Sequence, residues 1–203
     1  MASQVVCISH STGAGGEDVG RAVAEQLGFR YVDNEVIAQA AEWADLDPAF
    51  VANAERRKPF VARLLGQAVE QTPLRLSPAE SARRMPTDAD LRMLISDVLR
   101  SFVDQGSVVI VAHAGSFALA GHDVLRVFLT ASPETRAMRV AAARRIDENR
   151  AARVVKEEDV ARADYLKRFY AVDHELPIHF DVVINTDILA PEKAAGLVVL
   201  AAS

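Results

Sequence analysis

The stretch ISHSTGAGGEDVG, Ile8–Gly20, decides the fold class of this chain. An apolar run, Val5–Ile8, leads into it, a glycine-rich turn follows, and a helical pattern starts near Glu17. Glycines suit a turn whose backbone N–H groups close around phosphate oxygens, because a Cβ would block that approach. The dipole at the start of the following helix favours an anion at the same place. The pattern predicts a phosphate-binding loop made of Gly13, Ala14, Gly15 and Gly16.

The predicted loop departs from a complete Walker sequence at the two positions that carry side-chain chemistry. In a complete Walker loop, a lysine reaches the terminal phosphates and a hydroxyl holds Mg²⁺. This chain has Gly16 at the lysine position and Asp18 at the hydroxyl position. A lost charge-assisted hydrogen bond costs about 1.5–3 kcal/mol, and Glu17 adds a negative charge near the site of a triphosphate. Asp18 can still hold Mg²⁺ through a carboxylate oxygen. In the alternative interpretation, Glu17 and Asp18 only stabilise the first helical turn.

Length and composition indicate one globular domain, residues 1–203, with half of its residues apolar and a quarter charged. The net charge of −5 disfavours a nucleic-acid partner. Cys7 is the single cysteine, so an internal disulfide framework is excluded. We see neither a signal peptide nor the run of about 20 apolar residues that a membrane span needs. We therefore expect a cytoplasmic protein without a membrane partner. A homodimer is compatible with the sequence, which does not give the oligomeric state.

Short β-branched runs alternate with longer helical patterns. The predicted strands are Val5–Ser9, Phe29–Asp33, Ser107–Ala114, Leu125–Ala131 and Phe180–Thr186. The predicted helices cover residues 17–27, 34–44, 88–105, 133–145 and 156–171, and a last one starts at Pro191. Capping signals at Thr87–Asp90 and Ser132–Glu134 mark two helix starts. This alternation predicts an α/β fold with a parallel five-stranded sheet covered on both faces, and ligands at the carboxyl ends of its strands.

Residues 45–86 interrupt this alternation. They hold five prolines, at positions 48, 59, 73, 78 and 86, and bunched charge at Glu55–Lys58. We expect a helical excursion from the sheet that lies over the site. An irregular surface connection is the alternative.

Four segments in order along the chain resemble the cytidylate kinase-like proteins, relatives of bacterial cytidylate kinase within the P-loop nucleoside monophosphate kinases. They are LGFRYVDNEVI (Leu27–Ile37), LRVFLTASPETRAMR (Leu125–Arg139), DVARADYLKRFY (Asp159–Tyr170) and FDVVINTD (Phe180–Asp187). The resemblance covers roughly Val5 to Leu200. It implies a three-layer sandwich of the P-loop NTPase type, with a helical lid in residues 136–170.

The resemblance also shows where this chain departs from the family's sequence pattern. The branch commonly has Gly-Ser-Gly-Gly-Arg-Glu in the loop, so the missing lysine is expected, but Glu17 reverses the charge of the usual arginine. The family's Ser-Arg after the first strand is here Ser9-His10. The family's Gly-Arg-Gly after the third strand is here Ala112-His113-Ala114. The resemblance implies that the arginine of that family motif contacts the monophosphate. Three basic groups are therefore weakened or removed around one pocket.

His10 and His113 lie where parallel strands end at one edge of the predicted sheet. One hypothesis is a pair of imidazoles that titrates near neutral pH and binds phosphate when protonated. In the alternative, each ring hydrogen-bonds to nearby backbone.

Arginines are concentrated in one helical stretch, at Arg136, Arg139, Arg144, Arg145, Arg150, Arg153 and Arg162. Their planar, permanently charged groups suit phosphate, and the cluster resembles the arginines that the family's lid folds over its substrates. Arg139 and Arg162 match family motif positions, while Arg136 and Arg144 are further phosphate candidates. The alternative is a solvated face paired with Glu134, Asp147, Glu148, Glu157 and Glu158.

By the same resemblance, Asp33 lies near the acceptor nucleotide and Asn185 near the base. Asp33 could equally cap the helix that follows it.

The resemblance implies a phosphotransferase that uses Mg²⁺ and ATP, with a small phosphorylated acceptor such as CMP. The implied catalytic residues are Asp18, as the metal ligand, and Arg139 and Arg162, which would clamp the transferring group. Two rival interpretations stay open. One is a catalytically impaired nucleotide-binding or regulatory protein, favoured by Glu17 and the histidines. The other is an interaction module that uses the surface of residues 45–85.

Overall fold

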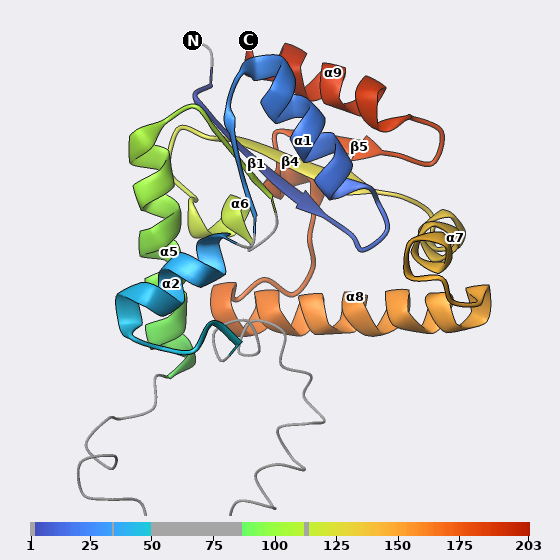
Figure 1. The fold of residues 1–203 in the computed structure, drawn as a ribbon, viewed down its shortest axis with the longest axis horizontal. Coiled ribbons are helices and arrows are strands. Elements are labelled where there is room, and N and C mark those ends of the chain that lie inside the picture. Colours follow the sequence, from blue (N-terminus) through green and yellow to red (C-terminus); the bar gives the residue numbers. More distant parts are fainter. Residues whose placement is uncertain (1–2, 34, 50–86, 112–113) are drawn as a thin grey trace, which may run out of the picture.

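The computed structural model describes residues 3–33, 35–49, 87–111 and 114–203. A five-stranded sheet lies at the centre (Figure 1). Its order is β2–β3–β1–β4–β5, and every neighbouring pair is parallel. The strands are β1 (Val5–His10), β2 (Arg30–Val32), β3 (Val108–Val111), β4 (Leu125–Thr130) and β5 (Val182–Asn185).

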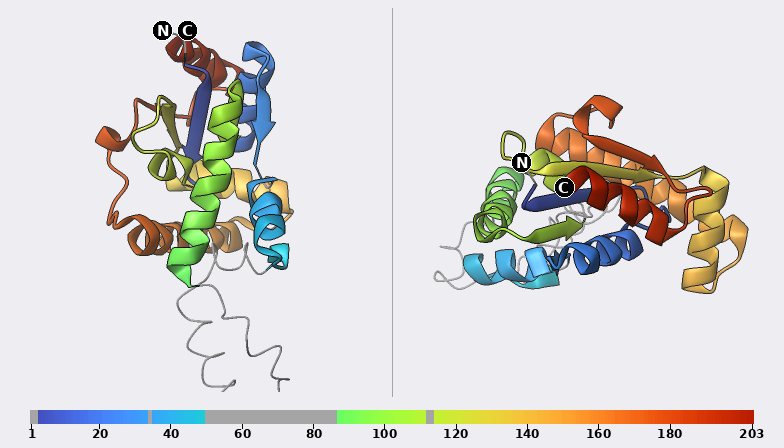
Figure 2. Two further views of the ribbon diagram at one scale, coloured as in Figure 1. Left: turned by 90° about the vertical axis from the view of Figure 1, so that its left-hand side faces the viewer. Right: turned by 90° about the horizontal axis from the view of Figure 1, so that it is seen from above.

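Helices cover both faces of this sheet (Figure 2). They are α1 (Gly16–Leu27), α2 (Glu35–Ala44), α5 (Asp88–Gln105), α6 (Gly115–Ala118), α7 (Pro133–Arg144), α8 (Glu148–Tyr170) and α9 (Pro191–Ala202), with a 3₁₀ turn, η1 (Pro177–His179). On β1, Val6 and Ile8 pack with α1 and α9, while Val5 and Cys7 pack with α2 and α5. The predicted three-layer α/β sandwich with a parallel five-stranded sheet is confirmed.

The predicted starts of α5 and α7 are also confirmed. Thr87 caps α5 and exchanges hydrogen bonds with Asp90 in a capping box. The Ser132 hydroxyl accepts from the Thr135 amide, with Pro133 in the first turn of α7. The helix predicted for residues 156–171 was too short at its start, because Asp147 caps α8 one residue before Glu148.

Several other expectations differ from the structure or lie outside it. The strand predicted as Ser107–Ala114 is limited to Val108–Val111, and Ala114 is left-handed at φ +50°. Residues 112–113 lie outside the described residues, and so does the part of the predicted excursion from 50 to 86. Neither α6 nor η1 was predicted. In the described ranges, no helix has the length and apolar character needed to cross a membrane.

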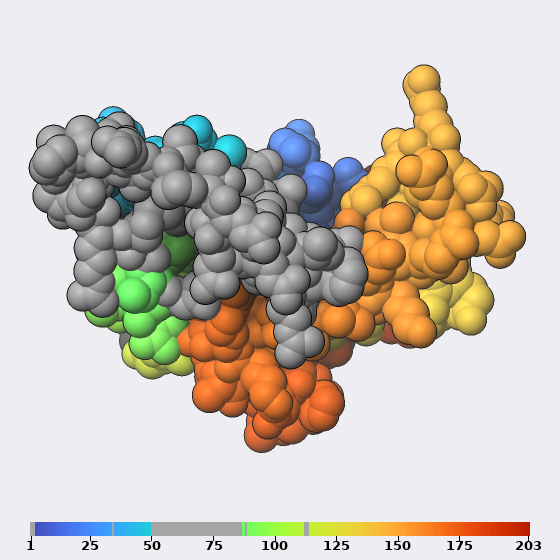
Figure 3. All heavy atoms as spheres, turned by 90° about the horizontal axis from the view of Figure 1, so that it is seen from below, coloured from blue at the N-terminus to red at the C-terminus, as the bar shows by residue number. Residues whose placement is uncertain are grey.

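Helices α7 and α8 form a hairpin beside the carboxyl edge of the sheet (Figure 1), and its turn projects from the body of the molecule (Figure 3). Ala137 and Val140 of α7 pack against Ala151 and Val155 of α8. The far end of α8 is anchored through buried Tyr165, which packs with Leu91 of α5 and Ala114. The hairpin is thus fixed at one end, and its basic side chains lie near the phosphate-loop candidate.

Candidate functional site

The loop between β1 and α1 has the backbone of an anion cradle. Gly13 and Gly15 are left-handed, with φ of +82° and +80°. Gly15 is the N-cap of α1 and offers no capping side chain. The first amides of a helix have no partner within it, so those of α1 are available to an anion, which the helix dipole also favours.

Two loop glycines are also required by packing. An ideal Cβ on Gly13 would lie 2.7 Å from the Arg136 carbonyl oxygen, and one on Gly16 would lie 2.1 Å from Cδ2 of His10. The loop is therefore held between the start of α7 and the His10 ring. A Cβ on Gly15 would meet nothing within 4 Å, so only its backbone angle favours glycine there.

His10 lies against this loop, with Nδ1 3.3 Å from the Ser11 carbonyl oxygen. Burial lowers the pKa of His10, and the charge of Arg162 lowers it further, against the opposing influence of Glu17 and Asp33. The imidazole is therefore neutral at neutral pH. The lowered pKa disfavours a charged ring, and the local backbone contact of the alternative is present; binding of phosphate by a protonated His10 stays a prediction. His113 lies outside the described residues.

The lowered pKa of His10 predicts a pH dependence of stability. As pH falls below the ordinary histidine pKa of 6.5, the unfolded chain takes up the proton before the folded protein does, so stability is lost. We expect His10→Gln to lose less unfolding free energy than the wild type between about pH 7.5 and about pH 5.5. Urea titrations at both pH values measure this. The exposed His122 supplies the control, His122→Gln, which should behave as the wild type does. Equal losses in His10→Gln and wild type would contradict the prediction.

Arg139 contacts backbone carbonyls of the loop and of the segment after β5. Its Nη1 donates to the Gly13 oxygen at 3.3 Å and to the Thr186 hydroxyl at 3.0 Å, and its Nη2 donates to the Thr186 carbonyl at 2.6 Å. The structure therefore places Arg139 against the loop. Its role as a clamp on the transferring group stays a prediction.

Arg136 forms a two-pronged ion pair with Asp159, at 3.0 and 2.5 Å. Arg136 is 5% exposed, so this guanidinium is enclosed between α7 and α8. Burial raises the pKa of Asp159, and the charges of Arg136 and Arg162 oppose that rise. The pair joins the two helices of the hairpin next to Gly13.

Arg144 and the loop share one carboxylate. Arg144 Nη2 donates to Glu158 Oε1 at 2.9 Å, and the Thr12 hydroxyl donates to Glu158 Oε2 at 2.7 Å. In the alternative of a solvated arginine face, Glu158 is one of the expected acidic partners, and its pairing with Arg144 is present. Its contact with the loop could not be foreseen, because the two residues are far apart in sequence.

Arg162 pairs with Glu175, through Nε at 2.7 Å and Nη2 at 2.8 Å. Their side chains are 23% and 13% exposed. Since the charge of Arg162 acts on His10, this pair lies on the His10 side of the loop. Glu175 was missed, because it follows α8 in a segment without a recognisable pattern.

Asp33 lies at the end of β2 on the same side. Burial, followed by the charge of Asp33, raises the pKa of Tyr31 to about 12. Arg21 lies over the Tyr31 ring, 4.6 Å from its centroid. Asp33 and Glu17 both act electrostatically on His10 and on Tyr31, so the structure brings these predicted residues together. The predicted acceptor contact of Asp33 stays a prediction.

Asn185 lies at the other end of the site, where its side-chain oxygen accepts from the Asp187 amide at 2.8 Å. Asp187 in turn accepts from the Ser132 amide at 2.8 Å, which ties the end of β5 to the start of α7. Asn185 is exposed, and its predicted position near a nucleotide base stays a prediction.

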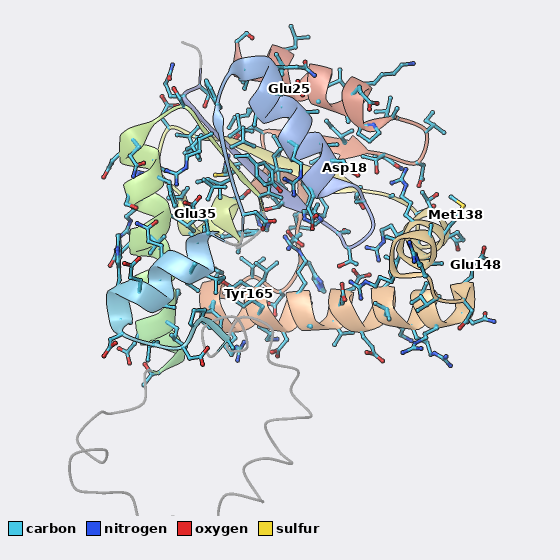
Figure 4. All side chains as sticks on the ribbon, viewed as in Figure 1. Asp18, Glu25, Glu35, Met138, Glu148 and Tyr165 are labelled. Atoms are coloured by element: carbon cyan, nitrogen blue, oxygen red, sulfur yellow. The ribbon has the colours of Figure 1, made fainter. Side chains whose placement is uncertain are left out.

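Asp18 is exposed on the first turn of α1 (Figure 4), beside the amides of the cradle. In the described ranges, no group of three or more His, Cys, Asp or Glu side chains is placed to hold a metal ion. Mg²⁺ commonly takes one or two carboxylates, with phosphate oxygens and water as its other ligands. A single carboxylate next to a phosphate cradle fits that pattern.

The sequence profile of the cytidylate kinase-like family matches residues 5–188. The chain belongs to the cytidylate kinase-like family. A cytidylate kinase from Ignicoccus hospitalis is 28% identical over 188 residues, which cover 93% of this chain and 92% of that one.

Two solved structures have the fold of this family member. An uncharacterized protein from Eubacterium ventriosum superposes with a TM-score of 0.66 at 15% identity, covering 98% of this chain and 97% of that one. Shikimate kinase from Acinetobacter baumannii, solved in complex with shikimate, reaches a TM-score of 0.50 at 16% identity, with 97% and 91% covered. At these identities the likeness concerns the fold alone.

Proposed function

We propose that this cytidylate kinase-like protein is a nucleotide kinase that transfers the γ-phosphoryl group of ATP to a small phosphorylated acceptor, with CMP the leading candidate. The observation that carries the proposal is the cradle of Gly13–Gly16, which opens at the start of α1 beside the arginines of α7 and α8. The curated cytidylate kinase relative aligns with almost the whole chain, which favours a nucleotide as acceptor.

Phosphoryl transfer depends mainly on positioning and on neutralising charge on the transferring oxygens. The amides of Gly15, Gly16 and Glu17 would hold the donor phosphates, and Asp18 would hold Mg²⁺ directly or through water. Bound Mg²⁺ supplies neutralising charge to the phosphates. Arg162, which lies on the His10 side of the loop, would contact the transferring group after exchanging Glu175 for phosphate.

A catalytically impaired nucleotide-binding or regulatory protein is the second candidate. It is favoured by the exposed Glu17 in the first turn of α1 and by the lowered pKa of His10. Both reduce the positive charge offered to phosphate. This candidate predicts nucleotide binding without turnover, whereas the kinase requires both.

Thermal unfolding with Mg·ATP, with CMP, and with both tests the proposed function. A ligand present at about 100 times its dissociation constant stabilises by about 2.7 kcal/mol, a shift of roughly 5–10 °C for a domain of this size. The kinase predicts shifts with each nucleotide and turnover of the mixture. Shifts without turnover would support the impaired protein, and the absence of any shift would overturn both.

The role of Asp18 has a matched control on the same helix. Asp18→Asn should reduce the shift given by Mg·ATP and leave that given by CMP. Glu25→Gln, in the last turn of α1 (Figure 4), should change neither. Equal effects of the two variants would exclude Asp18 as the metal ligand.

A further inference from the structure

Thr186 connects the end of the sheet with the phosphate loop. It follows β5 directly and is 3% exposed. Its hydroxyl oxygen lies 2.9 Å from the Ala14 carbonyl oxygen and 3.2 Å from that of Thr130. Arg139 donates to the same hydroxyl at 3.0 Å. Because that oxygen accepts from Arg139, the hydroxyl proton is directed to the carbonyls.

These contacts hold two successive carbonyls of the loop from one side. Arg139 holds the Gly13 oxygen and Thr186 holds the Ala14 oxygen. In a trans peptide the C=O and the next N–H point in opposite directions, so fixing the Ala14 carbonyl directs the Gly15 amide away from Thr186. The Ala14 amide is itself held by the Ser11 carbonyl at 2.9 Å, which closes the turn.

The orientation of the loop amides contributes more to phosphate binding in this chain than in a loop that carries a lysine. With Gly16 at the lysine position, the backbone amides and the dipole of α1 supply the local attraction for phosphate. A preorganised set of amides binds more tightly, because less ordering is needed on binding.

We propose that Thr186 and Arg139 are positioning residues that keep the phosphate loop in its binding conformation through the carbonyl oxygens of Ala14 and Gly13. This inference rests on the proposed function in one respect, that the loop binds the phosphates of a nucleotide. It differs from the prediction of Arg139 as a clamp on the transferring group, because both ends of the guanidinium are engaged with backbone or with Thr186.

Thr186→Val tests the positioning role, because it keeps the shape of the side chain and removes the hydroxyl. Mg·ATP affinity, measured by calorimetry, should fall about tenfold, as expected for one hydrogen bond of about 1.4 kcal/mol. Thr186→Ser should restore it, and CMP affinity should stay the same. Without nucleotide, the buried Ala14 amide, which donates to the Ser11 carbonyl, should exchange hydrogen faster in Thr186→Val than in the wild type.

Two further variants separate positioning from a general loss of stability. Thr87→Val removes the cap of α5, remote from the loop in sequence, and should lower the melting temperature, yet it should leave Mg·ATP affinity and loop exchange unchanged. Arg139→Lys keeps the charge and loses the fork, so it should resemble Thr186→Val and serves as the second test if that variant does not fold.

The outcomes distinguish this inference from the proposed function. Unchanged exchange of the Ala14 amide in Thr186→Val and Arg139→Lys would overturn the positioning role. Wild-type protein that does not bind Mg·ATP would overturn the proposed function, while faster exchange in the variants would still support positioning. Lost affinity with unchanged exchange would show that Arg139 or Thr186 contacts the nucleotide directly, and would overturn the inference.

Discussion

Gly13→Ala should destabilise the folded protein by about 2–5 kcal/mol, the sum of left-handed strain and overpacking. The strain arises because Gly13 has a φ of +82°. The overpacking arises because the new Cβ would lie 2.7 Å from the Arg136 carbonyl oxygen. That oxygen belongs to the backbone of α7, so no side-chain rotation relieves the contact, and either the loop or the helix must move.

Gly15→Ala is the matched control for this variant. Its φ of +80° is nearly the same, but a Cβ there meets nothing within 4 Å. We expect a loss of about 1–2 kcal/mol from strain alone. Urea unfolding of both variants measures the difference, which belongs to the contact with α7. Equal losses would contradict the close packing of the loop against Arg136.

Arg162→Met should lower both stability and turnover. It leaves Glu175, which is 13% exposed, without its partner, and breaking such a pair costs about 3 kcal/mol. If Arg162 also contacts the transferring group, turnover of Mg·ATP with CMP should fall about 100-fold or more. Urea unfolding and a coupled assay for nucleoside diphosphate measure the two effects.

A double variant separates these effects. Arg162→Met combined with Glu175→Leu removes both charges, and replacing a buried ion pair by apolar side chains is often neutral. Stability should recover while turnover stays low. Arg126→Met breaks the pair with Asp181 between β4 and the start of β5 and should spare turnover. Recovery of turnover in the double variant would show that Arg162 acts through stability alone.

The sheet could be predicted because its central strand is buried on both faces, which gives β1 the continuous apolar run Val5–Ile8. The starts of α5 and α7 could be predicted because their capping residues act within one turn. The start of α8 was missed, although Asp147 caps it in the same local way. The predicted strand Ser107–Ala114 was too long. Ala114 has a left-handed backbone that belongs to the turn into α6, and the apolar sequence gives no sign of that turn.

The site could be predicted only in part. The glycines of residues 13–16 and the clustered arginines indicated the loop and the basic hairpin, but they did not indicate which residues these side chains and backbone groups contact. Gly13 is required by the backbone of Arg136, and Gly16 by the ring of His10. The carboxylates of Asp159 and Glu175 and the hydroxyl of Thr186 reach the site through tertiary packing, so their spacing in the sequence carries no signal.

The contact between Thr12 and Glu158 has a consequence for how an anion enters. Glu158 accepts from Thr12 in the loop and from Arg144 at the end of α7, so it acts as an internal competitor for the donors that a phosphate would use. An incoming phosphate that accepts from the Thr12 hydroxyl would have to displace Glu158 Oε2 from it, while Oε1 can stay paired with Arg144. Occupancy of the loop would then be linked to the position of the Glu158 side chain. The measured affinity for a phosphate ligand would then include the free energy needed to break the hydrogen bond between Thr12 and Glu158.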